Sequence, residues 1–71
     1  MSKDIRLRLG EHIRSLRAKH DLTQEELARR AAISTNYLQN LESRNPKTAS
    51  VLTLEKLAKG FGVPVWQMLR F

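Results

Sequence analysis

The sequence predicts a compact all-α domain of about five short helices, and three observations lead to this fold class. Apolar residues recur at every third or fourth position along most of the chain, which is the spacing of one helical face. Thr23, Ser34 and Ser50 each precede such a stretch, and Thr and Ser are favoured at helix N-caps. No stretch alternates apolar and polar residues as a half-buried strand does. We therefore expect residues 1–71 to form a single domain.

The first helix is expected to begin near Ser2 or Asp4 and to end near Lys19. Its inward stripe has the i, i+4, i+7 spacing and consists of Leu9, Ile13 and Leu16. Gly10 lies inside this helix, where it costs about 1 kcal/mol of helix propensity. We attribute Gly10 to the close approach of another helix.

Two short helices are predicted next, from Gln24 to about Arg30 and from Thr35 to about Ser43. Glu26 follows Thr23 at the spacing of a capping box, in which each side chain bonds the other residue's backbone N–H. Only residues 31–33 link the two helices. Because so short a link forces a steep crossing angle, residues 23–43 are predicted to form a helix-turn-helix.

The second helix of this pair has an unusual outer face. Leu38 and Leu41 lie on its inner side, while the opposite side carries uncharged amide and hydroxyl groups, those of Thr35, Asn36, Gln39, Asn40 and Ser43. Such groups both donate and accept hydrogen bonds, which suits the base edges of a DNA major groove. The alternative interpretation is a polar helix surface that has no partner.

A fourth helix is predicted after Ser50, with a clear apolar stripe of Leu54, Leu57, Ala58 and Phe61. Gly62 is expected at its C-terminal end, where the chain needs a left-handed residue. A fifth helix is expected from Pro64, near its first position, to about Arg70.

The composition narrows the classes of function. Lys and Arg number 13 against 7 Asp and Glu, and the resulting net charge of +6 favours a polyanionic partner or plain solubility. The chain has no Cys, which fits a reducing cytoplasm, and no apolar run of membrane-spanning length. His12 and His20 have no further ligands at metal-binding spacing, and no Gly-rich phosphate loop is present. We expect no metal, cofactor, membrane contact or enzymatic activity.

The run from Leu22 to Glu42, L-T-Q-E-E-L-A-R-R-A-x-I-S-x-x-Y-L-x-x-L-E, resembles the phage repressor/Cro (XRE-like) family of helix-turn-helix domains. The likeness extends over roughly residues 9–69. Two departures stand out. Ala32 occupies the turn position where the family often has Gly, and the loop after Glu42 reads Ser43-Arg44-Asn45-Pro46, where the family usually has a Gly.

The resemblance implies a sequence-specific transcriptional regulator, a repressor, that binds double-stranded DNA as a homodimer with residues 35–43 in the major groove. By matching position, the base-reading residues are Thr35, Asn36 and Asn40, with Gln39 and Tyr37 beside them. The phosphate-contacting candidates are Gln24, Ser43, Arg44, Asn45, Lys47 and Thr48.

The resemblance also implies a bridge between Arg17 and Glu42 inside the domain. In the last helix, Val65 and Leu69 match inward positions, whereas Trp66 matches an outward one. A dimer interface is therefore expected at Trp66, Met68 and Phe71, because aromatic residues and Met are enriched at interfaces. The alternative is that Trp66 folds back onto its own chain.

Two further functions remain open at the level of sequence. The chain is also compatible with an antitoxin or a restriction–modification controller, both of which use the same DNA chemistry. A protein-interaction module that does not bind DNA is the alternative of a different class. No small-molecule effector is evident, and the operator and the regulated genes do not follow from the sequence.

Overall fold

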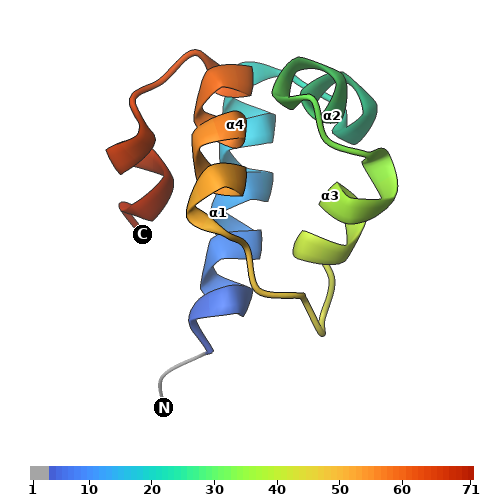
Figure 1. Ribbon diagram of the computed structural model, residues 1–71, viewed down its shortest axis with the longest axis vertical. Coiled ribbons are helices and arrows are strands. Elements are labelled where there is room, and N and C mark those ends of the chain that lie inside the picture. The colour runs from blue at the N-terminus through green and yellow to red at the C-terminus, as the bar shows by residue number, and fades with distance from the viewer. Residues whose placement is uncertain (1–3) are drawn as a thin grey trace.

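The computed structural model describes residues 4–71, which form four α-helices and a final 3-10 helix (Figure 1). In chain order the elements are α1 Ile5–His20, α2 Gln24–Ala31, α3 Thr35–Leu41, α4 Val51–Phe61 and η1 Val65–Leu69. The all-α class is confirmed, but the number of α-helices is four and not five. The last element spans only five residues and has no side-chain cap, and so short a segment favours the tighter 3-10 winding.

The helix starts follow the predicted capping signals. Thr23 and Glu26 form the full capping box, with N···O distances of 3.0 and 2.9 Å. Ser34 and Ser50 accept hydrogen bonds from backbone N–H groups three residues on. Asp4, one of the two predicted caps, is the N-cap of α1. The other candidate, Ser2, lies outside the described residues. Local side-chain chemistry thus sets where each α-helix begins.

The turn between α2 and α3 is made without glycine. Ala32 has φ 57° and ψ 42°, which is the left-handed region. Its N–H donates to the Arg29 carbonyl at 3.2 Å, and the Ile33 N–H donates to the Ala28 carbonyl at 3.0 Å. The left-handed conformation costs a non-glycine residue about 1 kcal/mol, which the surrounding packing offsets.

One apolar core joins all five elements. Its six most deeply buried side chains are Ile13, Leu27, Leu38, Leu41, Leu57 and Met68. In Figure 1, α4 crosses in front of α1, while α2 and α3 lie on one side of this pair and η1 lies on the other. Because α3 is held at the periphery, its outer face remains open to solvent.

The expected close approach at Gly10 is confirmed. Gly10 is buried in α1 and faces the backbone of Leu41 and Glu42 at the end of α3. The missing side chain lets the two helices meet backbone to backbone, which offsets the helix propensity that Gly loses. Among residues 4–71, no helix combines the length and the apolar character that a bilayer crossing requires.

Candidate nucleic-acid interface

A buried ion pair holds the helix-turn-helix onto α1. Arg17 donates from Nε and Nη2 to the two carboxylate oxygens of Glu42, at 2.9 and 2.8 Å, and its third bond goes to the Leu22 carbonyl at 3.1 Å. The Glu42 side chain is only 3% exposed. The carboxylate raises the pKa of Arg17 above its ordinary value through these hydrogen bonds. The Arg17–Glu42 pair implied by the resemblance is thus present as a two-pronged bridge.

Two further side chains complete the environment of Glu42. Gln24 Nε2 donates to Glu42 Oε1 at 3.2 Å, and Arg14 Nη1 donates to the Glu42 backbone carbonyl at 2.6 Å. The Gln24 side chain is therefore turned toward the ion pair, and its contact with a DNA phosphate stays a prediction. The backbone N–H of Gln24, in the first turn of α2, has no partner within the helix and can bond an anion.

The Arg14 contact was missed in the sequence, although a signal existed. Arg14 precedes Arg17 by three residues, so both lie on one face of α1. Its bond to the Glu42 carbonyl satisfies the C-terminal end of α3, where helix carbonyls lack partners. Arg14 thus fixes the end of α3 against α1.

The outer face of α3 has the polar character that the sequence predicted. Asn36 and Gln39 are exposed and Thr35 is half-buried, whereas Leu38 and Leu41 on the inner side are 0% and 2% exposed. The exposed groups are amides and hydroxyls on the side away from the core. This face of α3 can offer both hydrogen-bond donors and acceptors to a partner.

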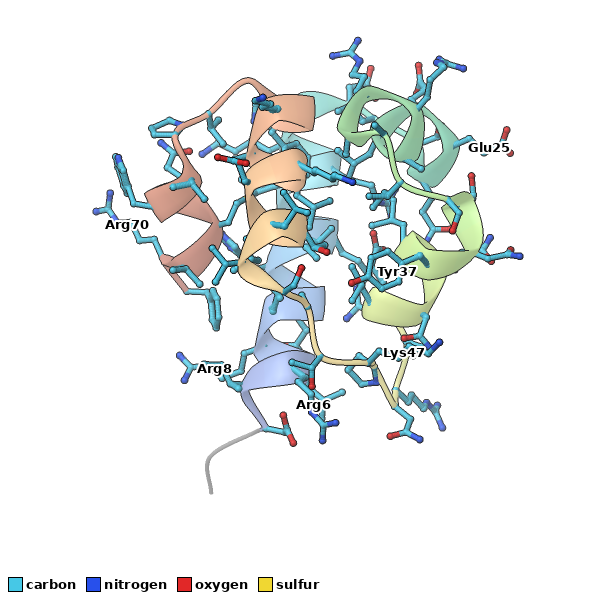
Figure 2. The ribbon with its side chains drawn as sticks, in the orientation of Figure 1. Arg6, Arg8, Glu25, Tyr37, Lys47 and Arg70 are labelled. Atoms are coloured by element: carbon cyan, nitrogen blue, oxygen red, sulfur yellow. The ribbon has the colours of Figure 1, made fainter. Side chains whose placement is uncertain are left out.

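Tyr37 does not belong to this face. Its hydroxyl lies 3.1 Å from Thr53 Oγ1, and its ring packs against the core. Figure 2 shows the side chain between α3 and α4. Tyr37, which the resemblance placed beside the base-reading residues, is instead turned toward the core, where its aromatic ring buries apolar area and its hydroxyl finds a partner within the domain.

Asn40 is half-buried and is attached to the loop that follows α3. Its Oδ1 accepts a hydrogen bond from the Lys47 backbone N–H at 2.8 Å, and its carbonyl accepts one from Ser43 Oγ at 2.6 Å. The sequence assigned the whole amide of Asn40 to a base. The structure instead uses one half of that amide to hold the chain.

The loop after α3 has a defined course around buried Pro46. Arg6 Nη1 of α1 approaches the Pro46 carbonyl at 3.5 Å, so the loop is held from two sides. The five loop residues that were predicted to contact phosphate are all exposed, namely Ser43, Arg44, Asn45, Lys47 and Thr48. Figure 2 shows Lys47 just beyond the end of α3. Two cations therefore border the polar face of α3.

The side of the last helix, η1, that faces the core is not the side that was expected. Trp66 is 52% exposed, as predicted, and the Arg70 guanidinium lies 5.8 Å from its ring centroid. Val65 and Leu69, which were expected inside, are 44% and 58% exposed, whereas Met68 is fully buried. A 3-10 helix has three residues per turn and not 3.6, so the inward positions of an α-helix do not carry over to this segment, and Met68 takes the inner side.

Phe71 is also engaged within its own chain. Its ring lies 5.3 Å from the Arg8 guanidinium and 5.3 Å from the His12 ring. The Arg8 side chain also donates to the Phe71 carbonyl at 2.9 Å. Of the three residues expected at an interface, only Trp66 is substantially exposed, because Met68 belongs to the core and Phe71 packs on α1.

A family model of the helix-turn-helix matches residues 13–65 of this chain, which include the whole of α2, α3 and α4. The chain belongs to the helix-turn-helix family. This is the family that the run from Leu22 to Glu42 indicated. Its members include DNA-binding transcriptional regulators, among them phage repressors.

Individual relatives of this helix-turn-helix protein agree with that assignment. An uncharacterised HTH-type transcriptional regulator, y4dJ of Sinorhizobium fredii, is 40% identical over 60 residues, which cover 84% of this chain and 77% of the relative. The immunity repressor protein of Bacillus phage phi105 is 37% identical over 57 residues, covering 80% of this chain and 39% of the repressor. The chain thus spans well under half of that phage repressor.

Solved structures share the fold. The clp gene regulator ClgR from C. glutamicum is 34% identical with a TM-score of 0.84, and the match covers 96% of this chain and 87% of ClgR. The restriction–modification controller protein C.AhdI from Aeromonas hydrophila is 25% identical with a TM-score of 0.82, covering 89% and 94% of the two chains. The arrangement of α1 to η1 is therefore that of known gene regulators.

Proposed function

We propose that this helix-turn-helix protein is a sequence-specific transcriptional repressor that binds double-stranded DNA as a homodimer on an inverted-repeat operator in the cytoplasm. The observation that carries the proposal is the exposed, uncharged face of α3 beside a loop with two exposed cations. Base edges need groups that donate and accept hydrogen bonds, and phosphates need positive charge. Both requirements meet at one end of the molecule.

In the proposed complex α3 lies in the major groove, with its N-terminal half toward the bases. Thr35, Asn36 and Gln39 then face base edges, and an Asn amide can pair with adenine through N6 and N7. Arg17, Glu42 and Arg14 hold α3 on the body of the domain. A rigidly held α3 places these side chains without a large ordering cost on binding.

The loop after α3 and the start of α2 supply the proposed phosphate contacts. Arg44 and Lys47 provide charge, and Ser43, Asn45 and Thr48 provide exposed polar side chains. The Gln24 backbone N–H lies at the positive end of the α2 dipole, where an anion is favoured. These contacts fix the position on the duplex and carry no sequence information by themselves.

The homodimer is proposed to form through the exposed side of η1. Val65, Trp66 and Leu69 are all more than two-fifths exposed, which is unusual for three neighbouring large apolar residues. A twofold dimer presents two α3 helices to successive major grooves. The proposed operator therefore has two inverted half-sites about one DNA turn apart.

One alternative has a specific observation in its favour. The structural similarity to C.AhdI, over most of both chains, is compatible with a controller of a restriction–modification operon. Such a controller, like an antitoxin, uses the same DNA-binding surface, so the genes bound distinguish it from a repressor. A pure protein-interaction module would instead show no salt-dependent DNA binding.

The test is a titration of the protein on its selected operator and on a scrambled duplex at two salt concentrations. Asn36→Ala should weaken operator binding by about 1–3 kcal/mol and leave scrambled DNA nearly unchanged. Arg44→Ala should weaken both duplexes similarly and reduce the salt slope by about 1. If Asn36→Ala weakens both duplexes equally, α3 is not the reading helix.

A further inference from the structure

The amide of Asn40 has a fixed orientation. Its partner at 2.8 Å is the backbone N–H of Lys47, and a backbone N–H can only donate. The atom of Asn40 that faces Lys47 must therefore be the oxygen, because the amide nitrogen is itself a donor. The usual ambiguity between the oxygen and nitrogen of an Asn side chain does not arise here.

This orientation decides which half of the amide is left for a ligand. The oxygen and nitrogen of a planar amide point in different directions from the same carbon. With Oδ1 turned to the loop that follows α3, Nδ2 is left on the other side of the side chain. Asn40 lies one helical turn after exposed Asn36 on the outer face of α3. The free half of Asn40 is thus a hydrogen-bond donor.

The loop side of this contact is held independently. The Ser43 hydroxyl and backbone N–H both donate to the Asn40 carbonyl, at 2.6 and 3.0 Å. Pro46 is buried, and Arg6 approaches its carbonyl from α1. The loop is therefore tied to α3 at Ser43 and lies against α1 at Pro46, the residue before Lys47.

We propose that Asn40 is a positioning and specificity-determining residue that joins the phosphate-binding loop to α3 through Oδ1 and reads guanine through Nδ2. This inference rests on the proposed function of α3. An Asn that pairs with adenine must offer both an acceptor to N6 and a donor to N7. The loop occupies one of the two lone pairs of Asn40 Oδ1 and turns the oxygen to that side, so Asn40 presents its two Nδ2 hydrogens to the groove. Guanine presents two adjacent acceptors, N7 and O6, whereas adenine and thymine each present one, N7 and O4, so guanine matches the free half best.

The proposal separates Asn40 from Asn36, although the two residues are identical in type and lie on the same face. Asn36 is exposed and is not part of the loop contact, so it can use both amide atoms on adenine. Asn40 has a second role that Asn36 lacks, because it sets where Lys47 lies relative to the bases. Loss of its side chain should therefore affect phosphate binding as well as base reading.

The test begins with the full chain and a library of random-sequence duplexes, from which the operator is selected. The affinities of the wild type, Asn40→Asp and Asn36→Asp are then measured with all four base pairs at each half-site position. Asp keeps an oxygen for the Lys47 N–H but replaces the free donor with an acceptor. Asn36→Asp is the matched control, since it adds the same charge to the same face one turn earlier.

One half-site position should prefer guanine about tenfold in the wild type, and Asn40→Asp should shift that position toward cytosine, which presents the N4 donor. Asn36→Asp should change a different position. If the wild type selects an operator but Asn40→Asp keeps its base profile, the reading of guanine is wrong while the proposed function stands. If the wild type selects no sequence, both are wrong.

Hydrogen exchange of the Lys47 amide tests the positioning role without DNA. Exchange should be slowed in the wild type and in Asn40→Asp, and about tenfold faster in Asn40→Ala. Asn36→Ala should leave it unchanged. Equal Lys47 exchange in the wild type and in folded Asn40→Ala, as judged by its circular dichroism melt, would show that Asn40 does not hold the loop.

Discussion

Gly10 of α1 lies against the carbonyl oxygen of Leu41 in α3, and a Cβ atom at position 10 would be only 2.5 Å from that oxygen. The neighbouring atom is backbone, so no side-chain rotation can relieve the contact. This approach sets the distance between α1 and the reading helix.

Gly10→Ala should therefore destabilise the domain, even though Ala is the better helix former. Forcing the two backbones apart should outweigh the gain in helix propensity and leave a net loss of about 2 kcal/mol. Chemical denaturation measures the change. Ser15→Ala, at an exposed position of the same helix, is the control and should be neutral or slightly stabilising. A Gly10→Ala variant as stable as the wild type would contradict the close packing of α1 and α3.

Glu42→Ala should strand Arg17 in a partly buried position without its anion. Arg14 would retain the backbone carbonyl, but Gln24 would also lose its acceptor. Removing one partner of such a bridge should cost about 3 kcal/mol in unfolding free energy. Glu55→Ala, at an exposed position of α4, should change it by less than about 0.5 kcal/mol. A thermal melt in which both variants behave alike would argue against a structural role for the ion pair.

Ala32→Gly should stabilise the protein. Ala32 has a positive φ of 57°, which glycine adopts without a steric penalty. After allowance for the greater freedom of glycine in the unfolded chain, the gain should be between about 0.3 and 1 kcal/mol. Urea denaturation provides the measurement. Ala18→Gly, at an exposed position within α1, is the opposite control and should destabilise by about 1 kcal/mol.

Asp4 should make the stability of α1 depend on acid pH. Hydrogen bonds from the Arg6 side chain and backbone lower the pKa of Asp4 from 3.8 to about 2. Because the folded-state pKa is the lower one, the stabilisation is present above about pH 4 and is lost as the pH falls toward 2.

The melting temperatures of the wild type and Asp4→Asn should thus differ at pH 7 and converge near pH 2. Asn retains the capping ability of position 4, so the comparison isolates the charge. An NMR titration that finds the Asp4 carboxyl at its ordinary pKa would rule out this source of pH dependence.

Trp66→Ala should weaken self-association about tenfold or more, because a half-exposed Trp beside exposed Val65 and Leu69 is a candidate centre of an interface. Sedimentation at several protein concentrations measures the change. Lys59→Ala, an exposed substitution on α4, should leave association as it was. Unchanged association of Trp66→Ala would place the dimer contact elsewhere.

The sequence by itself determined the α-helices, their starts and the turn between α2 and α3. These features depend on residues close in the chain. Thr23 and Glu26 bond each other's backbone N–H, the Ser34 hydroxyl accepts from the Tyr37 N–H, and Gly62 adopts the left-handed conformation that ends α4. Helical periodicity likewise predicted the inner and outer faces of α3, and the resemblance indicated the pairing of Arg17 with Glu42.

Only the tertiary structure decided what several polar and apolar side chains contact. Tyr37 lies at the edge of a polar helix face, yet Thr53 of α4 draws its hydroxyl inward. Helical spacing alone places Asn40 and Gln24 on outer helix faces. In the folded chain, Asn40 bonds Lys47, seven residues away, and Gln24 bonds Glu42, eighteen residues away. Met68 and Leu69 exchanged their expected sides because the last segment winds as a 3-10 helix. Helical spacing specifies directions within one element, whereas the partners that use those directions come from other elements, and their positions are set by packing.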